Sequence, residues 1–546
     1  MSTPDPVEES PDTGIGLLRS TAVMSAGTLL SRVTGLLRIT AMAYALGVAH
    51  SRIADAYNVA NNTPNIVYEL ILGGVLTSVF VPVFVEWLHR RGRDESWDVA
   101  RQVMTIAVAS LSAIALLSIL LAPLIVDLYT VNLRGGPAAQ AERASATFFL
   151  RWFMPQIVFY GVGAVASGLL NAHRRFAAPM FAPVLNNLVV IATFLAFVAL
   201  PGPAVPTPGG ITTAQRYALA IGTTFGVVAM TAALWPSLRA IGFRFAWRWN
   251  LRGEAVRRIA RLALWVFLYV LVNQLGLIVV IILATGTVEI TTYNVAFILF
   301  QLPHAIFAVS IMTALLPALA ARWAEHDVDG FRSFLARGLR MTALVVVPSA
   351  LGYVALAGPI ARLLLAHGVA TDAQAALVAQ VLRFFAIGLF SFSAFQLLLR
   401  AFYAMQDTKT PALVNVAAVG VNTAANFVYF HFLGVRGLAL AHATAYTFGA
   451  ILLAILIRRR LGGLDGRTIL QGIGKVAVAS VATAGAAWGT ARVLGHALGT
   501  ETLAKQFVQV MGSVGVGLLV FLGMALLLRM EDLRQLVAMV TGRFRR

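Results

Sequence analysis

Long apolar runs separated by short polar segments recur along the whole chain. Each run holds about 20 mainly apolar residues, the length that a helix needs to cross the hydrocarbon core of a bilayer. The pattern predicts about fourteen membrane helices, with approximate spans at 17–47, 56–88, 102–130, 144–171, 179–201, 214–238, 261–285, 291–321, 340–365, 374–404, 410–432, 436–457, 470–491 and 506–528. Because several runs exceed the minimum length, we expect tilted helices or helices that extend beyond the bilayer.

The two halves of this pattern resemble each other. The segment LRWF at 150–153 recurs as LRFF at 382–385, and YNVA recurs at 57–60 and 293–296. Each copy holds six predicted helices, and an even number gives both copies the same orientation in the membrane. The sequence therefore predicts an all-α polytopic membrane protein with two six-helix lobes in a parallel repeat, followed by two C-terminal helices.

This division predicts four parts of the chain. They are a disordered cytoplasmic N-terminus at 1–15, an N-lobe with helices 1–6 at 16–245, a C-lobe with helices 7–12 at 246–462, and helices 13–14 with a basic tail at 463–546. The first part is short, polar and acidic, a composition typical of disorder. It lacks the basic start of a cleavable signal peptide, so the first apolar run is expected to remain as a helix.

Composition agrees with a membrane protein, since only 12% of the residues are charged and the mean hydropathy is +0.80. The net charge of +19 does not indicate nucleic-acid binding, because most arginines lie in loops between apolar runs. Loops after even-numbered helices hold about 22 basic residues, against about 6 in the other loops, which places both termini in the cytoplasm. The basic loops are expected to contact anionic lipid headgroups.

Charged and amide side chains interrupt the first two predicted helices. A charge inside a membrane helix is costly, so each one needs a partner or a function. The predicted substrate-binding residues are Arg32, Arg38, Asn61, Asn65 and Gln301, and the predicted gating or ion-pair residues are Asp55 and Glu69. We expect the two arginines to border a cavity and to bind an anionic headgroup, because guanidinium forks match phosphate oxygens. The alternative is an Arg38–Asp55 ion pair that locks the first two helices.

Other polar residues within apolar runs keep two interpretations. Gln301 and His304 either line a cavity or stabilise a helix break. Asn415, Asn422 and Asn426 either coordinate a cation or form hydrogen bonds between helices, which is the commoner role. Arg400 is expected to extend toward the cytoplasmic interface.

Several function classes lack support in the sequence. The chain has no cysteine, which excludes disulfides and thiolate metal sites. It has no HExxH, Walker, GxSxG or DDxxD motif, so a transporter is favoured over an enzyme, with no cofactor and no direct coupling to ATP.

The stretch 31–84 resembles the N-terminal signature of the MurJ/MviN lipid II flippases. The matching positions are Ser31-Arg32, Gly35, Arg38, Asp55-Ala56-Tyr57, Pro64-Asn65, Gly74 and Phe80-Val81-Pro82. The segments 300–320 and 405–415 also resemble parts of that family. The resemblance covers nearly the whole chain.

This resemblance implies the fold of the multidrug/oligosaccharidyl-lipid/polysaccharide exporter superfamily, with a cavity between the lobes. It implies an undecaprenyl-diphosphate-linked muropeptide as substrate, moved outward across the bacterial cytoplasmic membrane by alternating access. It also implies that Arg32 and Arg38 bind the diphosphate and that the last two helices form a groove for the lipid tail. Transport would draw on an ion gradient or the membrane potential, and cell-wall synthesis machinery is a possible partner.

The sequence departs from the family pattern at three places. Ile39 stands where many members have Asp, Tyr68-Glu69 where many have a basic residue, and Phe297-Ile298 where a cavity arginine is common. The cavity is therefore expected to be less positive than in those members. Three other functions stay open: export of drugs or of another polyprenyl-linked oligosaccharide, glycosyl transfer within the membrane, and a scaffold for cell-wall enzymes.

Overall fold

The computed structural model describes residues 12–71, 84, 86, 93–173, 175–250, 253–530 and 532–533, and over these ranges its secondary structure is helical. The start of the chain at 1–11, the second half of the expected helix 56–88 and the basic tail at 534–546 therefore lie outside the described residues, apart from residues 84 and 86.

The first group of helices corresponds to the expected N-lobe. It contains α1 (Asp12–Leu46), α2 (Arg52–Ile71), α4 (Arg93–Leu120), α5 (Ala122–Tyr129), α6 (Pro137–Phe153), α7 (Gln156–Ala172), α8 (Ala177–Ala199), α9 (Thr213–Ala232) and α10 (Trp235–Ala240). We call these helices the N-lobe.

The second group corresponds to the expected C-lobe. It contains α11 (Glu254–Gly286), α12 (Ile290–Pro303), the π-helical turn η2 (His304–Ala308), α13 (Val309–Ala324), α14 (Val328–Leu365), α15 (Asp372–Ile387), α16 (Leu389–Ala404), α17 (Lys409–Leu433) and α18 (Val435–Arg460). We call these elements the C-lobe. Two further helices, α19 (Gly466–Leu498) and α20 (Leu503–Leu527), follow it.

The helices confirm the predicted all-helical membrane architecture. In the described ranges, 11 helices are long and apolar enough to cross a membrane, and α15 with α16 forms a further span bent by 46°. The two remaining expected spans are 56–88, which extends beyond the described residues, and 261–285, of which Val270–Gly286 counts as a shorter apolar helix. Large apolar side chains such as Leu120, Phe432 and Leu527 are more than 70% exposed, as expected where lipid replaces water.

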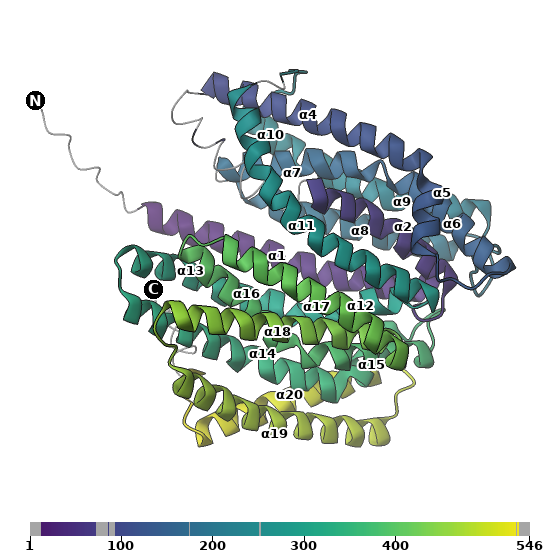
Figure 1. The fold of residues 1–546 in the computed structure, drawn as a ribbon. Coiled ribbons are helices and arrows are strands. Elements are labelled where there is room, and N and C mark those ends of the chain that lie inside the picture. Colours follow the sequence, from purple (N-terminus) through teal and green to yellow (C-terminus); the bar gives the residue numbers. More distant parts are fainter. Residues whose placement is uncertain are drawn as a thin grey trace, which may run out of the picture.

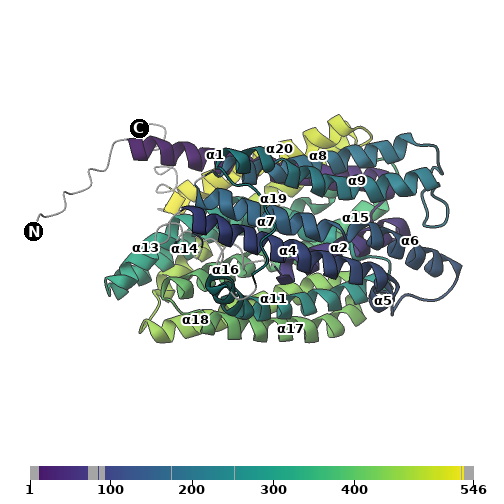
Figure 2. The ribbon, with the colours of Figure 1, turned by 90° about the horizontal axis from the view of Figure 1, so that it is seen from above.

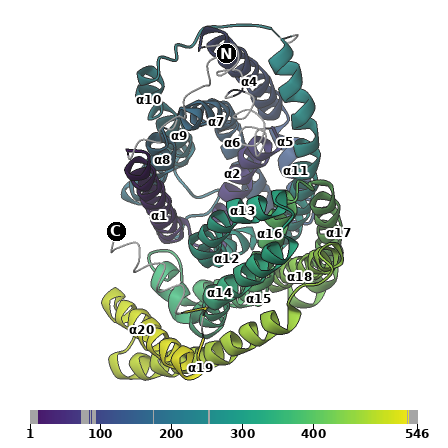
Figure 3. The same ribbon diagram turned by 90° about the vertical axis from the view of Figure 1, so that its left-hand side faces the viewer.

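The two lobes lie side by side, with α1 and α11 running between them (Figure 1). The start of α1 and the end of α20 lie at the same end of the bundle, and Figure 3 views the helices from that end. The final pair, α19 and α20, packs against α14 on the side of the C-lobe away from the N-lobe (Figures 1 and 3). Figure 2, seen from above, shows that most of the helices run along one common direction.

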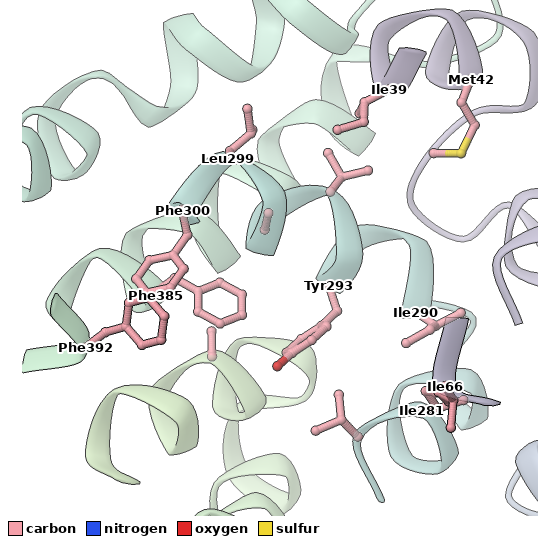
Figure 4. Packing of buried hydrophobic residues seen from close by; sticks show 14 of the residues in the cluster. Ile39, Met42, Ile66, Ile281, Ile290, Tyr293, Leu299, Phe300, Phe385 and Phe392 are labelled. Carbon is pink, nitrogen blue, oxygen red and sulfur yellow. The ribbon is translucent and has the colours of Figure 1, made fainter. Parts of the chain in front are cut away.

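The repeated sequence segments meet inside each lobe. In the N-lobe, the rings of Tyr57 and Phe153 lie with their centroids 5.4 Å apart. In the C-lobe, the equivalent rings of Tyr293 and Phe385 lie 5.2 Å apart. Figure 4 shows the second cluster, in which Phe385 packs beside Phe300 and Phe392. Each copy of the repeat thus holds two helices together through the same aromatic pair.

Candidate functional site

A cavity of about 620 Å³ lies between the lobes. Its wall is formed by α1, α2, α11, α12, α17 and α18. Its polar lining residues are Arg38, Asn58, Asn61, Asn62, Asn65, Asn273, Gln274, Tyr293, Asn294, Gln301, Asn415, Asn422, His442 and Tyr446. Fourteen of the 22 lining residues therefore have polar side chains, although apolar membrane helices build the cavity.

Helix periodicity explains how so many amides reach one cavity. On α2 the lining residues are Asn58, Asn61, Asn62 and Asn65, which are spaced i, i+3, i+4 and i+7. Residues with this spacing share one face of a helix. On α17, Asn415 and Asn422 are separated by seven residues and fall on one face in the same way. Small residues between them, such as Ala418, leave room for the cavity.

The cavity carries little charge. Among the described residues that line it, Arg38 is the one charged side chain, and ten residues are asparagine or glutamine. Phe297 and Ile298, at one of the three places where the sequence departs from the family pattern, line this cavity. The arrangement can therefore bind an anionic group at one point and can form many uncharged hydrogen bonds elsewhere.

Most of the predicted substrate-binding residues lie on this wall. Arg38, Asn61, Asn65 and Gln301 line the cavity. Arg32 does not: it lies six residues nearer the chain start on α1, and its side chain is exposed. The role of these five residues in substrate binding stays a prediction.

Arg32 instead lies near a second cluster of polar residues, which is separate from the cavity lining. His304, in the turn η2, lies within electrostatic range of both Arg400 and Arg32. Its Nδ1 is 2.9 Å from the Ser393 hydroxyl, and that hydroxyl donates to the Leu389 carbonyl. The Ser393 hydroxyl thus accepts from His304, which fixes the imidazole against α16.

Asp55 connects the two lobes. Its side chain is fully buried, and its carboxyl oxygens accept hydrogen bonds from the backbone N–H of Ile290, at 3.2 Å, and of Thr291, at 3.0 Å. These amides belong to the first turn of α12, so Asp55 on α2 caps a helix of the other lobe. The alternative of an Arg38–Asp55 ion pair is not what the structure shows. Glu69, the other predicted gating residue, is exposed and has no ion-pair partner in the described part of the chain.

Further hydrogen bonds surround Asp55. Asn58 Nδ2 donates to the Thr291 hydroxyl at 3.0 Å, and the His50 N–H donates to the Val288 carbonyl at 3.1 Å. The Val369 N–H donates to the Tyr44 carbonyl at 3.0 Å. We call this set, with Asp55, the inter-lobe contact. It joins the lobes at the end that the arginine distribution predicts to be external, because it connects the loops after helices 1, 7 and 9 of the predicted order.

The inter-lobe contact lies at the pseudo-twofold axis. Asp55 and Thr291 each stand two residues before a copy of YNVA, so they occupy equivalent positions of the repeat. Two equivalent residues can touch only near the axis that relates them. The lobes therefore meet close to the axis that relates the two copies of the repeat.

Several cavity residues were not singled out by sequence reasoning. Asn273 and Gln274 form a polar pair inside an apolar run, and this pattern could have identified them as candidate cavity residues. His442 gave none: its ring is surrounded by the rings of Phe300, Phe385 and Tyr446, with centroid distances of 5.3, 5.4 and 4.5 Å. The described residues contain no group of three or more His, Cys, Asp or Glu that could hold a metal ion.

Comparison with known proteins gives a consistent result. A family model described as lipid II flippase MurJ matches residues 42–508. The lipid II flippase MurJ of Burkholderia cenocepacia is 31% identical over 452 residues, which cover 82% of this chain and 84% of the relative. The probable lipid II flippase MurJ of Vibrio cholerae is 28% identical over 531 residues, covering 95% of this chain and 98% of the relative.

Solved structures show the same fold. The structure described as lipid II flippase MurJ in an inward closed conformation superposes with a TM-score of 0.75 at 21% identity, covering 93% of this chain and 99% of that chain. An inward-facing multidrug resistance MATE family transporter of the MOP superfamily gives a TM-score of 0.65 at 14% identity, covering 79% of this chain and 94% of that one.

Proposed function

This chain belongs to the lipid II flippase MurJ family, and from that premise we propose that it moves lipid II from the cytoplasmic to the outer leaflet for peptidoglycan synthesis. The observation that carries the proposal is the polar cavity of about 620 Å³ between two membrane-embedded lobes, which are joined at one end by the inter-lobe contact. A lipid-linked headgroup needs a polar path of this kind, because its polar groups are too costly to transfer through hydrocarbon.

The proposed mechanism is alternating access. The headgroup enters the cavity while the prenyl tail remains in the lipid. Arg38 then lowers the cost of bringing the diphosphate into the membrane, because a buried anion needs a cationic, hydrogen-bonding partner. The inter-lobe contact must break before the headgroup can leave on the other side. No covalent step is required, so the protein acts as a transporter and not as an enzyme.

The setting of this transport follows from the charge distribution. We infer that both termini lie in the cytoplasm and that the inter-lobe contact faces outward, since the loops on the terminal side carry most of the arginines. The protein would reside in the bacterial cytoplasmic membrane. Its basic loops would bind anionic lipids, and it would work beside cell-wall synthesis enzymes. An ion gradient or the membrane potential would supply the energy, without a cofactor.

Reconstitution into vesicles tests the proposal. Purified protein should move the headgroup of lipid II across the bilayer. Arg38→Ala should reduce the rate by at least tenfold, because the diphosphate loses the one charged group that the described lining offers it. Arg32→Ala should reduce it as well if Arg32 receives the diphosphate before the cavity does. Normal translocation and normal growth with both arginines replaced would refute the arginine role.

The MATE-like fold supports one second candidate, the export of drugs or of another polyprenyl-linked oligosaccharide. Complementation of a strain depleted of its lipid II flippase separates the two. Rescue of growth supports the lipid II assignment, whereas drug resistance without rescue supports the alternative.

A further inference from the structure

The C-lobe side of the cavity has an unusual composition for a site that receives a diphosphate. Gln274 on α11 and Asn415 and Asn422 on α17 face the cavity beside the rings of His442 and Tyr446 on α18. We call these five residues the carboxamide wall. None of them carries a fixed charge. Arg38, the one charged side chain among the described residues that line the cavity, comes from α1 of the N-lobe.

We propose that the carboxamide wall is a subsite for the neutral sugar and amide groups of the transported headgroup, and that it sets the preference for a glycosylated substrate. This inference rests on the proposed function and assigns one part of the cavity to one part of the ligand. The phosphates would be bound by Arg38, and the sugars by the C-lobe.

The donor and acceptor chemistry of the wall fits such a ligand. A carboxamide offers two N–H donors and a carbonyl acceptor within one small group. Sugar hydroxyls and acetamido groups also donate and accept, so each can pair with a carboxamide in two ways. A phosphate only accepts and is better bound by a cation. A metal cation prefers carboxylates, and none lines the described part of this cavity.

Unmet hydrogen bonds on the wall point to a missing partner. Gln274 Oε1, Asn415 Nδ2 and His442 Nδ1 are buried and lack a hydrogen-bond partner. Asn415 and His442 are also more than nine-tenths buried as whole residues. Buried polar groups in proteins are almost always paired, so several unpaired groups around one cavity indicate a site that a polar ligand completes. Rotation of an amide about its last torsion presents either of its polar atoms to that ligand.

Shape supports the same assignment. The volume of about 620 Å³ falls within the range of about 300–1,000 Å³ that is typical of sites for small organic ligands. The rings of His442 and Tyr446 lie with centroids 4.5 Å apart and are tilted by 46°, so they add aromatic surface to the wall. A sugar ring can contact one of these rings with its apolar face while its hydroxyls reach the carboxamides.

Binding of two lipids to the full-length protein tests the inference. Ile298 lines the cavity outside the wall, and the natural chain has no cysteine, so Ile298→Cys gives a single thiol whose labelling reports occupancy. The probes are lipid II and undecaprenyl diphosphate, which lacks the sugars. In the Ile298→Cys background, Gln274→Leu and Asn415→Leu should each weaken lipid II binding about tenfold, the effect of one or two lost hydrogen bonds. Binding of undecaprenyl diphosphate should change by less than about twofold.

A matched control separates the wall from general effects of removing a buried amide. Gln156 on α7 is buried, donates to the Thr224 hydroxyl at 3.1 Å and is not among the residues that line the cavity. Gln156→Leu should leave the affinities for both lipids unchanged. Thermal unfolding of each variant shows whether it folds. If Asn415→Leu does not fold, the more conservative Asn415→Ser takes its place.

The outcomes are distinct. Loss of lipid II affinity alone supports the inference, whereas equal losses for both lipids, or no loss for either, overturn it. Transport by the unchanged protein is measured separately in vesicles. If lipid II binds through the wall but is never translocated, the proposed function fails while the subsite stands.

Discussion

At the scale of single residues, Asp55 shows how a membrane protein keeps an acidic side chain inside its bundle. Its carboxyl oxygens accept from the N–H groups of Ile290 and Thr291, which have no partner within the first turn of α12. The capped helix belongs to the other lobe. One side chain therefore satisfies the end of a helix and also holds the two lobes together.

Replacing Asp55 should open the external end of the cavity. Asp55→Ala removes both hydrogen bonds and leaves the first turn of α12 uncapped, at a cost of about 1–2 kcal/mol. A cost of this size shifts the ratio of closed to open molecules by roughly tenfold. We expect a membrane-impermeant maleimide added outside whole cells to label Ile298→Cys about tenfold faster in the Asp55→Ala background.

Asp55→Asn is the matched control for this prediction. Its amide keeps one acceptor oxygen for the α12 amides, so labelling should rise less than in Asp55→Ala. Equal labelling of all three proteins would show that Asp55 does not hold the external end closed.

The sequence predicted part of the site at this scale. The polar run 58–65 could be assigned to one helix face from its spacing alone, and Arg38, Asn61 and Asn65 do line the cavity. The convergence of Gln274, Asn415 and His442 could not be predicted, because it depends on how α11, α17 and α18 pack. The partner of Asp55 could not be predicted either, because it is a backbone N–H and almost every residue has one.

At the scale of helices, the 46° bend between α15 and α16 depends on close packing at Gly388. A Cβ at this residue would lie 2.5 Å from Ala443 Cα on α18. Only a glycine lets the two backbones approach this closely. Ala443 follows His442, so the bend also fixes the position of one cavity residue.

Gly388→Ala should therefore destabilise the C-lobe. Forcing α18 away from the bend is an overpacking change that costs about 1–3 kcal/mol. Gly420 on α17 offers a control, because a Cβ there would have no atom within 4 Å. We expect thermal unfolding in detergent to show a lower melting temperature for Gly388→Ala, and an unchanged or slightly higher one for Gly420→Ala. The same melting temperature for both variants would contradict the packing argument.

A second contact between elements attaches the last two helices to the C-lobe. Arg340 on α14 binds Asp532, which follows α20, with Nε 3.0 Å from Oδ2 and Nη2 3.3 Å from Oδ1. Both side chains are mostly buried, at 18% and 20% exposure. Arg362 and Asp372 form a comparable pair that is more exposed, at 39% and 72%.

Arg340→Ala should cost more stability than Arg362→Ala. The first change leaves Asp532 partly buried without its partner, at about 1–3 kcal/mol. The second removes a more exposed pair, which contributes at most about 1 kcal/mol, and a long hydrogen bond of 3.4 Å from Arg362 to the Thr500 hydroxyl. Unfolding in detergent, followed by the heat-induced loss of monodisperse protein, would measure the difference. A larger effect at Arg362 would show that the Arg340 pair does not anchor α20.

At the scale of the whole molecule, the duplication visible in the sequence predicts more than a helix count. It makes Tyr57 equivalent to Tyr293 and Phe153 to Phe385, and the structure shows that each lobe pairs these two rings. It also predicts an axis between the lobes. It does not predict which side of the cavity is closed. That depends on the free energy difference between two arrangements of the same lobes, to which contacts such as Asp55 with Thr291 contribute.

Alternating access requires the inter-lobe contact to break in every transport cycle, so a covalent bridge across it should stop transport. His50 Nε2 lies 3.7 Å from Glu289 Oε1, and the two residues come from different lobes. We expect His50→Cys with Glu289→Cys, joined by a short bifunctional thiol reagent, to lose lipid II translocation in vesicles while still binding lipid II from the cytoplasmic side. Cleavage of a reducible bridge should restore the rate. Arg362→Cys with Asp372→Cys places the same bridge within the C-lobe and should leave transport intact, because the lobes then move as before. Full translocation by a completely bridged His50–Glu289 pair would mean that transport does not need the two lobes to separate at this contact. A mechanism other than rocking of the lobes would then be required.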